Sequence, residues 1–361
     1  MFDYWVLIID YFITMDILNK IKKAGLVGRG GACFPTATKW QMVKNAEGEI
    51  KYVVCNASEG EPGIKKDFFI LENYGERVID GIDIAIDFLK AEKAYIFLNF
   101  KYYKKLNKKI DELIKDKKIN IFTKPINSGY IGGEESSVLN TIEGKRIEPR
   151  FRPPFPTTAG LHGCPTLINN VETFYNVSLV ATKGFKKNRF YTIDGDCLNA
   201  GVYEMPDSWT INKILKETNN YPRFPFFVQI GGDASGWILN NKQLGQKVTG
   251  SGSVTIYSMV KNKPKDLIKN WLNFFLDESC GQCTPCREGV YRLVEIIESS
   301  KPNWQLFSDL LENLELSAFC GLGCAVPIPI ESYVNNVLVK MPNNKIKIKN
   351  LNKKVICECF K

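Results

Sequence analysis

The chain has 361 residues, 44% of them hydrophobic and 24% charged, which is typical of a globular protein of about two or three domains. Its apolar runs are shorter than the roughly 18–20 residues that a membrane-spanning helix needs. The apolar start carries Asp3 and Asp10 and has no basic region, unlike a signal peptide. The formal charge of +9 comes largely from lysines along helix-like stretches, without a nucleic-acid-binding motif, so we expect no binding to DNA or RNA.

The cysteine and histidine counts narrow the chemistry. The chain has 11 cysteines and a single histidine, His162. This cysteine density is far below that of a disulfide-stabilised scaffold. One histidine argues against a histidine-rich metal site and against Ser-His-Asp catalysis. We therefore expect the chemistry to come from cysteines, carboxylates, the backbone and bound cofactors.

The first half of the chain alternates between helix and strand patterns. We expect helices at 15–24, 76–90 and 101–116 and strands at 52–55, 95–98 and 119–122. Such alternation implies right-handed crossovers and a parallel sheet. The sequence therefore predicts an α/β domain over residues 1–185.

The second half contains two further patterns. Short strands with glycine-marked turns are expected at 191–196, 200–204, 226–230 and 253–257, with one helix at 207–217. The pattern is then mostly helical, at 266–277, 287–299, 303–315 and 330–339. We predict a small α+β domain over 186–262 and a helical domain over 263–361.

Three cysteines stand three residues apart at Cys280, Cys283 and Cys286, and the next one is Cys320. A CxxCxxC run with a remote fourth cysteine is typical of the ligands of a [4Fe-4S] cluster. A helix begins just after the run, and the N–H groups at its start would stabilise anionic thiolate and sulfide. A zinc ion, a redox-active dithiol and free buried cysteines are the alternatives. The spacing does not choose between Cys320 and Cys324 as the fourth ligand.

One loop near the amino end is too rich in glycine for an ordinary turn. Gly28, Gly30 and Gly31 would let backbone N–H groups approach a phosphate, and Arg29 and Lys39 supply positive charge. The segment is not the GxGxxG dinucleotide motif, because no strand precedes it and its sixth position is not glycine. A tight loop without a ligand is the alternative.

Two other loops carry polar residues next to an expected strand or helix. Gly133 opens a helix and is followed by Glu134 and Glu135, which suit the hydroxyls of a ribose or ribityl chain. Acids that complement the helix dipole are the alternative. The other loop follows the first expected strand, where ligands of open α/β sheets bind. Its amide and carboxylates are those of Asn56, Glu59 and Glu61.

Together these segments resemble the NADH-binding flavoprotein subunit of respiratory complex I (its F subunit) and the diaphorase subunits of NAD(P)-linked hydrogenases and formate dehydrogenases. The similar segments keep one order along most of the chain, from about residue 16 to residue 325. They include Gly28-Arg-Gly-Gly31, Phe34-Pro-Thr36, Asn56-Ala-Ser-Glu59-Gly-Glu61-Pro-Gly63, Gly133-Glu-Glu135, Pro153-Pro-Phe-Pro156, Asn169-Asn-Val-Glu-Thr173, Glu278-Ser-Cys-Gly-Gln-Cys-Thr-Pro-Cys-Arg-Glu-Gly289 and Cys320-Gly-Leu-Gly323.

The resemblance implies a Rossmann-like first domain that binds FMN and NADH, a β-grasp second domain and a helical third domain with one [4Fe-4S] cluster. The implied residues around the flavin and its phosphate are Gly28, Arg29, Gly30, Gly31, Lys39, Asn56, Gly133, Glu134, Glu135, Asn169 and Asn170, and Glu59 is a further implied cofactor-binding residue. The residues implied to face NADH are Phe34, Glu61, Glu135, Arg152 and Phe155, with Glu61 and Glu135 as the catalytic pair that orients the nicotinamide and ribose. The implied cluster ligands are Cys280, Cys283, Cys286 and Cys320, in preference to Cys324.

Five positions depart from the pattern of the resembled family. Ser58 stands where Asp is usual, Cys33 where glycine is usual, and Met42 where an aromatic residue is usual. Arg152 replaces a usual Lys, and Phe68 a common Arg. Because ribose hydroxyls and a 2′-phosphate require opposite charge, the choice between NADH and NADPH stays open.

We therefore expect an enzyme subunit that transfers a hydride from NADH to FMN and then passes electrons singly through a [4Fe-4S] cluster to partner iron–sulfur subunits. The alternatives are a diaphorase subunit of a soluble hydrogenase or formate dehydrogenase, and an electron-transfer scaffold without flavin. We expect it in the cytoplasm, held at the inner face of the cell membrane only through partner subunits. The helix start of the resembled family matches Met15 and Asp16, so residues 1–14 are expected to be an upstream translation artefact.

Overall fold

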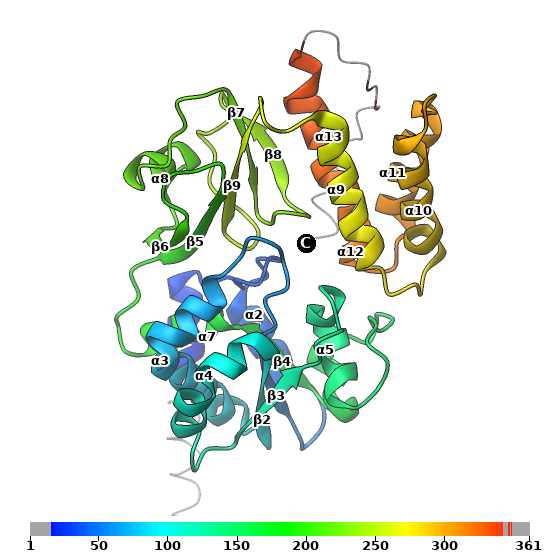
Figure 1. Ribbon diagram of the computed structural model, residues 1–361. Helices are drawn as coiled ribbons and strands as arrows, with labels where there is room; N and C mark the ends of the chain where they lie inside the picture. Colours follow the sequence, from blue (N-terminus) through cyan, green and yellow to red (C-terminus); the bar gives the residue numbers. More distant parts are fainter. Residues whose placement is uncertain (1–15, 342–345, 347, 349–361) are drawn as a thin grey trace, which may run out of the picture. The chain divides into compact units, whose positions relative to one another are not determined.

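The computed structural model describes residues 16–341, 346 and 348 (Figure 1). Its contacts form two compact units. The first comprises the described part of Met1–Glu59 with Lys66–Ser128 and Gly132–Asn188, and the second comprises Gly60–Lys65, Gly129–Ile131 and the described residues from Arg189 onward. The expected upstream segment 1–14 lies outside the described residues. The finer division into three domains stays a prediction.

A four-stranded parallel sheet lies at the centre of the first unit, in the order β3-β2-β1-β4. Its strands are β1 (Tyr52–Ala57), β2 (Lys93–Asn99), β3 (Ile119–Lys124) and β4 (Thr166–Asn170). The predicted parallel α/β fold is confirmed. Sequence patterns missed β4, because this short strand ends in two asparagines, residues that are depleted in strands.

Helices cover both faces of this sheet. They are α2 (Thr36–Asn45), α3 (Lys66–Leu89), α4 (Phe100–Leu113), α5 (Glu135–Ile142), α6 (Pro156–Ala159) and α7 (Val171–Ala181), after a helical segment at residues 16–24. Figure 1 shows α3, α4 and α7 on one side of the sheet and α5 on the other. On the α5 side, Val138 and Leu139 pack with Val54, Phe97 and Ile168 in a buried cluster.

Helix α3 begins at Lys66 and is kinked at Tyr74, whose backbone is non-helical. The helix predicted from residue 76 corresponds to the part after the kink. The part before the kink was missed because Lys66 and Asp67 read as polar surface, whereas both are buried. Further along, a Cβ on Gly81 would meet the carbonyl oxygen of Phe174 at 2.0 Å. Glycine at this position therefore lets α3 and α7 pack at close range.

The second unit contains a five-stranded mixed sheet in the order β6-β5-β9-β7-β8. Its strands are β5 (Asn188–Gly195), β6 (Gly201–Pro206), β7 (Phe226–Ile230), β8 (Trp237–Asn240) and β9 (Ser253–Ser258). Strand β9 runs parallel to β5, and β7 runs antiparallel to β8 and β9. Helix α8 (Ile211–Glu217) packs on it through Ile211, Ile214 and Leu215. It begins later than predicted because Thr210 caps its first turn.

Helices follow the sheet in the second unit. They are α9 (Pro264–Asp277), α10 (Thr284–Glu298), α11 (Trp304–Ser317), α12 (Gly321–Ala325) and α13 (Pro327–Asn336). Helices α10 and α13 start earlier than predicted, since a proline is well tolerated in the first turn of a helix. Among the described residues, no helix combines the length and apolar character needed to cross a membrane.

Helix α13 covers the edge of the second sheet. The backbone N–H of Ile238, in edge strand β8, donates to Ser332 Oγ at 2.9 Å, and the carbonyl of Ile238 accepts from Asn336 Nδ2 at 2.7 Å. The amide of Asn240 also donates to the carbonyl of Asn336, at 2.9 Å. These bonds satisfy backbone groups that an open sheet edge would leave free, and they explain why the sheet and the helices form one compact unit.

Glu331 on α13 predicts a pH dependence of stability. It is buried with a carboxyl oxygen that has no hydrogen-bond partner, and burial, followed by the charges of Glu315 and Glu312, raises its pKa to about 8. The folded state therefore holds a proton that the unfolded chain releases, and stability falls as pH rises from about 4.5 to about 8. We expect Glu331→Gln to raise Tm above that of the wild type at about pH 8.5 and far less at about pH 5.

The control for this measurement is Glu288→Gln on α10, whose side chain is 63% exposed. Thermal unfolding of the two variants and the wild type at both pH values would be followed by circular dichroism. An increase in Tm for Glu331→Gln that is the same at both pH values would contradict the prediction.

Candidate functional site

The polar residues predicted from the sequence gather at the carboxyl edge of the first sheet. In the register of the parallel strands, Asn56 of β1 lies opposite Asn170 of β4, and Cys55 lies opposite Asn169. Ser58 follows directly, and its hydroxyl donates to Asn56 Oδ1 at 2.7 Å. Ligands of open parallel sheets bind at this edge.

The glycine loop is closed at its base. Val27 and Pro35 form an isolated β-bridge, and the N–H of Gly28 donates to the carbonyl of Phe34 at 2.8 Å. Cys33 lies in the left-handed region with a φ of 53°, where glycine is favoured. The departure of Cys33 from the family's glycine therefore places a side chain at a strained position of the loop.

The closed loop rests on the start of α7. A Cβ on Gly30 would lie 3.3 Å from the Cβ of Asn170, so the loop can approach the end of β4 this closely because it carries no side chain there. The N–H of Arg29 donates to Thr173 Oγ1 at 3.0 Å, and its Nε lies 4.0 Å from Glu172 Oε1. Arg29 is itself buried. Its backbone and guanidinium therefore attach the loop to Thr173 and Glu172 in the first turn of α7.

Three of the predicted ligand-binding side chains meet next to this loop. Lys39 of α2 places its Nζ 3.1 Å from Glu135 Oε2 and 3.1 Å from the carbonyl oxygen of Ile168. Arg152 lies 3.2 Å from the other oxygen of Glu135. Burial would raise the pKa of Glu135, but the charges of Lys39 and Arg152 outweigh it and hold that pKa below its usual value. Glu135 is therefore ionised at neutral pH.

Glu134 caps helix α5. Its carboxylate accepts from the N–H groups of Ser136 and Ser137, at 2.9 and 3.0 Å, and pairs with Arg152. These bonds match the helix-capping alternative, and contact of Glu134 with a ligand stays a prediction. Next to it, the carbonyl of Gly133 accepts from Asn56 at 2.8 Å.

The amides of the two predicted asparagines are used inside the protein. With the Asn169 amide turned so that both of its atoms are satisfied, its oxygen accepts from Trp40 Nε1 at 3.0 Å. Asn170 Oδ1 accepts from Lys66 Nζ at 3.0 Å, and its Nδ2 donates to Asp67 Oδ2 at 2.6 Å. Their side chains therefore hold the edge of the sheet together.

Glu59, which follows β1 at the same edge of the sheet, binds the start of α3 and the side chain of Tyr102. Its carboxylate accepts from the N–H of Asp67 at 2.7 Å, from the N–H of Phe68 at 3.2 Å and from the hydroxyl of Tyr102 at 2.7 Å. Burial, followed by the charge of Asp67, raises its pKa to about 7. Glu59 thus anchors the start of α3, and its predicted contact with a cofactor stays a prediction. The ring of Phe68, a departure from the family pattern, lies 5.0 Å from that of Tyr102.

Glu61 belongs to the second unit, whereas Glu135 belongs to the first. Its carboxylate accepts from the N–H groups of Ala234 and Ser235, at 3.0 and 3.1 Å, and from the hydroxyl of Tyr130. Burial raises the pKa of Glu61 in spite of these bonds. The predicted catalytic pairing of Glu61 with Glu135 stays a prediction.

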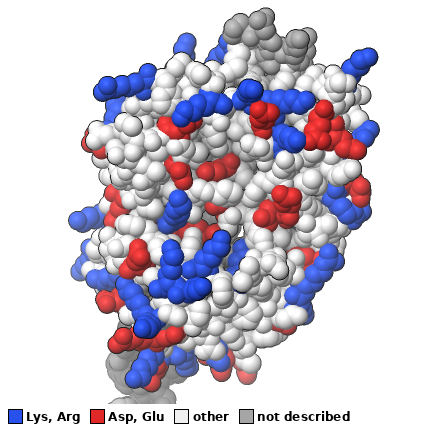
Figure 2. Space-filling model, viewed as in Figure 1, with Lys and Arg blue, Asp and Glu red and all other residues white. Residues whose placement is uncertain are grey.

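Aromatic and apolar side chains near the predicted nucleotide site are accessible. Phe155 is 49% exposed, Met42 is 43% exposed and Phe34 is half-buried. Exposed rings of this kind are available to stack on a ligand. On the face seen in Figure 2, lysines and arginines are interspersed with acids instead of forming one large basic patch.

The predicted cluster cysteines lie at the starts of two helices of the second unit. Cys283 directly precedes α10, Cys286 lies in its first turn, and Cys320 directly precedes α12. Burial, and then the nearby thiols of Cys283 and Cys280, raises the pKa of Cys286. A Cβ on Gly323 would lie 3.5 Å from that of Cys286, so the start of α12 lies next to the CxxCxxC run.

Cys324 is placed differently from Cys320. Its thiol donates to the carbonyl of Ala318 at 3.5 Å. Within the described ranges, no three or more His, Cys, Asp or Glu side chains are arranged to hold a single metal ion.

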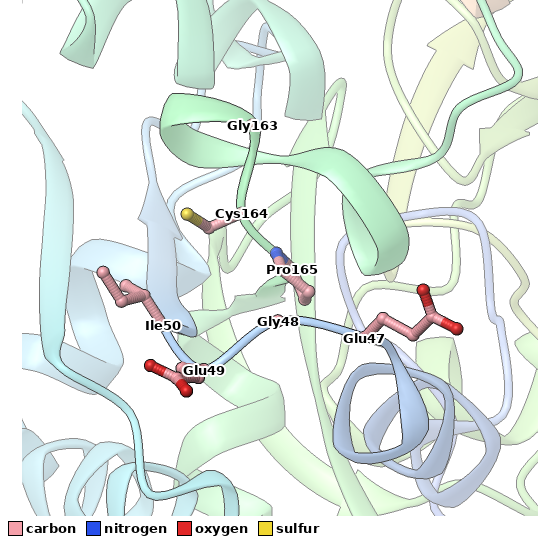
Figure 3. A pocket seen from close by; sticks show the side chains of 7 residues that line it. All are labelled: Glu47, Gly48, Glu49, Ile50, Gly163, Cys164 and Pro165. Carbon is pink, nitrogen blue, oxygen red and sulfur yellow. The ribbon is translucent and has the colours of Figure 1, made fainter.

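A surface pocket at the opposite edge of the first sheet is separate from this site. Figure 3 shows its lining, which consists of Glu47, Gly48, Glu49, Ile50, Gly163, Cys164 and Pro165. Pro165 directly precedes β4, and its carbonyl accepts from the N–H of Tyr52 at the start of β1 at 3.0 Å. The pocket therefore lies at the amino ends of the strands.

Sequence reasoning missed three charged residues below the site, namely Lys66, Asp67 and Glu172. All three are buried, with at most 2% of each residue exposed. A signal was available, because Lys66 and Asp67 precede the buried Ile70 by one helical turn and so fall on its face of α3. Glu172 lies in the Asn169-Asn-Val-Glu-Thr173 segment, and nothing in that segment indicates that its carboxylate is buried.

Comparison with known proteins identifies both regions. The family described as "Nuo51 FMN-binding domain" matches residues 21–179, and the one described as "NADH-ubiquinone oxidoreductase-F iron-sulfur binding region" matches residues 266–338. The second match contains Cys280 to Cys324. It confirms the iron–sulfur interpretation over the zinc alternative.

Whole-chain relatives agree with these matches. The chain is 32% identical to the F subunit of the NADH-quinone oxidoreductase of Streptomyces coelicolor over 88% of this chain and 80% of that one. It is 33% identical to "NAD-reducing hydrogenase HoxS subunit alpha" of Cupriavidus necator over 87% of this chain and 58% of that one. A solved "NAD+-reducing [NiFe]-hydrogenase in the H2-reduced state" contains a chain that matches with a TM-score of 0.83 and 29% identity, over 90% of this chain and 61% of the solved chain. The chain belongs to the family of the NADH-quinone oxidoreductase F subunits.

Proposed function

We propose that this chain is the electron-input subunit of a multisubunit oxidoreductase that oxidises NADH. Bound FMN would accept a hydride from NADH, and a [4Fe-4S] cluster would pass the electrons on singly to an iron–sulfur partner. The proposal depends on one observation, that a single chain carries both the FMN-binding match and the iron–sulfur match. The protein's own residues then serve to bind, orient and shield these groups.

The carboxyl edge of the first sheet carries backbone groups that are suited to FMN. Gly30 lies close against Asn170, and a Cβ on Gly133 would lie 2.6 Å from Ser58 Oγ. Backbone N–H groups without side chains are suited to a phosphate and to a flat ring. We assign the flavin phosphate to the glycine loop with Lys39, and the ring to Asn56 and Gly133.

The nucleotide site is assigned to the ion cluster around Glu135. Because Lys39 and Arg152 hold Glu135 in its ionised form, its carboxylate is an acceptor that suits the hydroxyls of a ribose. Phe34 and Phe155 would stack on the bases and exclude water. Glu61, for which the resemblance implies a role in orienting the nicotinamide, lies in the second unit, where the N–H groups of Ala234 and Ser235 hold its carboxylate.

The cluster ligands are assigned to the thiols of Cys280, Cys283, Cys286 and Cys320. The run beside α10 and the start of α12 lie next to each other, and N–H groups at helix starts stabilise thiolate and sulfide. Cys320 directly precedes α12, and the resemblance of the Cys320–Gly323 segment to the family favours it over Cys324 as the fourth ligand.

We place the protein in the cytoplasm, bound to the inner face of the cell membrane through partner subunits.

A second candidate function is that of a diaphorase subunit in an NAD-reducing hydrogenase, which is favoured by the hydrogenase relative and the solved hydrogenase chain. Isolation of the native complex separates the two. Copurification with iron–sulfur and membrane subunits would support the first function, and copurification with a nickel-containing subunit would support the second.

The FMN site predicts a specific effect at Gly133. Gly133→Ala would bring a Cβ within 2.6 Å of Ser58 Oγ, which would displace Ser58 and the Asn56 amide bonded to it. We expect at least a roughly 10-fold increase in the FMN dissociation constant, because the displaced groups include donors to the ligand. Quenching of flavin fluorescence on titration of flavin-depleted protein measures it.

Gly245→Ala is the control for Gly133→Ala. Gly245 has an ordinary φ and no neighbouring atom within 4 Å of an added Cβ. We expect wild-type affinity from this variant. Equal FMN affinity in both alanine variants would remove the support for the assigned ring site.

The ligand assignment predicts different outcomes for Cys320→Ser and Cys324→Ser, which lie on the same short helix start. We expect Cys320→Ser to lose iron and the low-temperature EPR signal of the reduced cluster. Cys324→Ser should retain both, because the assignment makes Cys320 and not Cys324 a ligand. The reverse pattern would show that Cys324 is the fourth ligand.

An anaerobic NADH titration tests the function itself. Purified protein is expected to lose flavin absorbance on addition of NADH and then to show a reduced [4Fe-4S] signal by EPR on the same sample. Protein that contains iron but neither binds added FMN nor responds to NADH would instead support a scaffold without flavin. In that event Ser58, which replaces the family's Asp, is the first position to restore.

A further inference from the structure

Lys66 is a buried cation at the start of α3. It contacts Asn170, against which Gly30 of the glycine loop packs. Only 2% of the residue is exposed. Its ammonium lies 2.6 Å from Asp67 Oδ1, 3.0 Å from Asn170 Oδ1 and 3.4 Å from Glu172 Oε2. Asp67 and Asn170 accept hydrogen bonds from this ammonium, and Glu172 forms an ion pair with it.

The partners compensate the cost of burying this charge. A buried cation without a partner costs several kcal/mol. Burial alone would lower the pKa of Lys66, but the charges of Asp67 and Glu172 outweigh burial and raise it. Lys66 is therefore charged at neutral pH, where it faces the carboxyl groups of Asp67, Glu172 and Glu59.

The orientation of Asn170 depends on this arrangement. Its Oδ1 accepts from Lys66 and, at 3.0 Å, from the N–H of Glu172, while its Nδ2 donates to Asp67. An amide between a cation and a carboxylate has one favourable orientation, because reversing it would place a donor against a donor and an acceptor against an acceptor. Lys66 and Asp67 thus fix this side chain.

The glycine loop rests on the residues that Lys66 holds. Gly30 lies against the Cβ of Asn170, and the Arg29 guanidinium lies 4.0 Å from Glu172 Oε1. The same Glu172 carries the contact to Lys66 on its other oxygen. A change at Lys66 would therefore reach the loop through two side chains.

We propose that Lys66 is a positioning residue of the flavin site, which holds Asn170 and Glu172 so that the glycine loop keeps the shape that receives the phosphate of FMN. This inference rests on the proposed function, since it takes the loop to be a phosphate site. Lys66 acts through its neighbours and not by contact with the ligand. Its removal would also leave two buried carboxylates with one cation beneath the loop, which opposes the binding of an anion.

The test compares FMN with riboflavin, which lacks the phosphate, on flavin-depleted full-length protein. For Lys66→Met we expect at least a roughly 10-fold weaker affinity for FMN, because charge-assisted hydrogen bonds are lost, and a far smaller change for riboflavin. Lys65→Met is the matched control at the neighbouring position, where the side chain is 70% exposed. It should leave both affinities unchanged.

A second control separates positioning from general loss of stability. Ile82 is fully buried further along the same helix, and Ile82→Val should lower Tm by removing a methyl group without changing FMN affinity. If Lys66→Met does not fold, Lys66→Gln replaces it in the same titrations, because its amide can still donate to Asn170.

Each outcome decides one question. Wild-type affinity for FMN in the Lys66 variant, or equal losses for FMN and riboflavin, would overturn the inference. If Ile82→Val also loses FMN affinity, and the loss relative to its fall in Tm equals that of the Lys66 variant, loss of stability explains both results. That outcome would also overturn the inference. Failure of the wild-type protein to bind FMN would instead overturn the proposed function.

Discussion

The parallel pairing of β1 with β4 is the interaction on which the site of the first unit depends. It brings Asn56 opposite Asn170, although the two strands are far apart in sequence, and every loop of the site starts from or rests on these strand ends. A slip of one residue would turn the side chains to the other face of the sheet. Lys66 holds the end of β4 through Asn170, whose amide also donates to the carbonyl of Asn56 in β1 at 3.5 Å.

Much of the site could be predicted from the sequence where one local segment carries the signal. The glycine loop, the acids before α5 and the CxxCxxC run each reveal their chemistry through neighbouring residues, and the structure places the last of these at a helix start as expected. Strand β4 and the pairing of Lys66 with Glu172 could not be predicted in this way. They depend on contacts between distant segments, and burial cannot be read from the charge of a residue alone.

The structure also separates two roles that the motifs do not distinguish. Asn169, Asn170, Glu59 and Glu134 belong to the motifs of the family, yet their side chains are hydrogen-bonded to the protein itself. Such bonds shape the site by fixing backbone positions. Motif membership therefore indicates that a residue is needed at the site without indicating that it touches the ligand.

The net charge of +9 contributes little at the site itself. Lys39 and Arg152 are paired with Glu135 and Glu134, and Arg29 and Lys66 lie next to buried carboxylates. An anionic ligand therefore meets a nearly neutral set of ions and must gain its affinity from directed N–H groups and fixed dipoles, which act at short range. Recognition of that kind requires a loop held in one shape, and this requirement explains why so many polar residues below the loop are engaged with one another and not with the ligand.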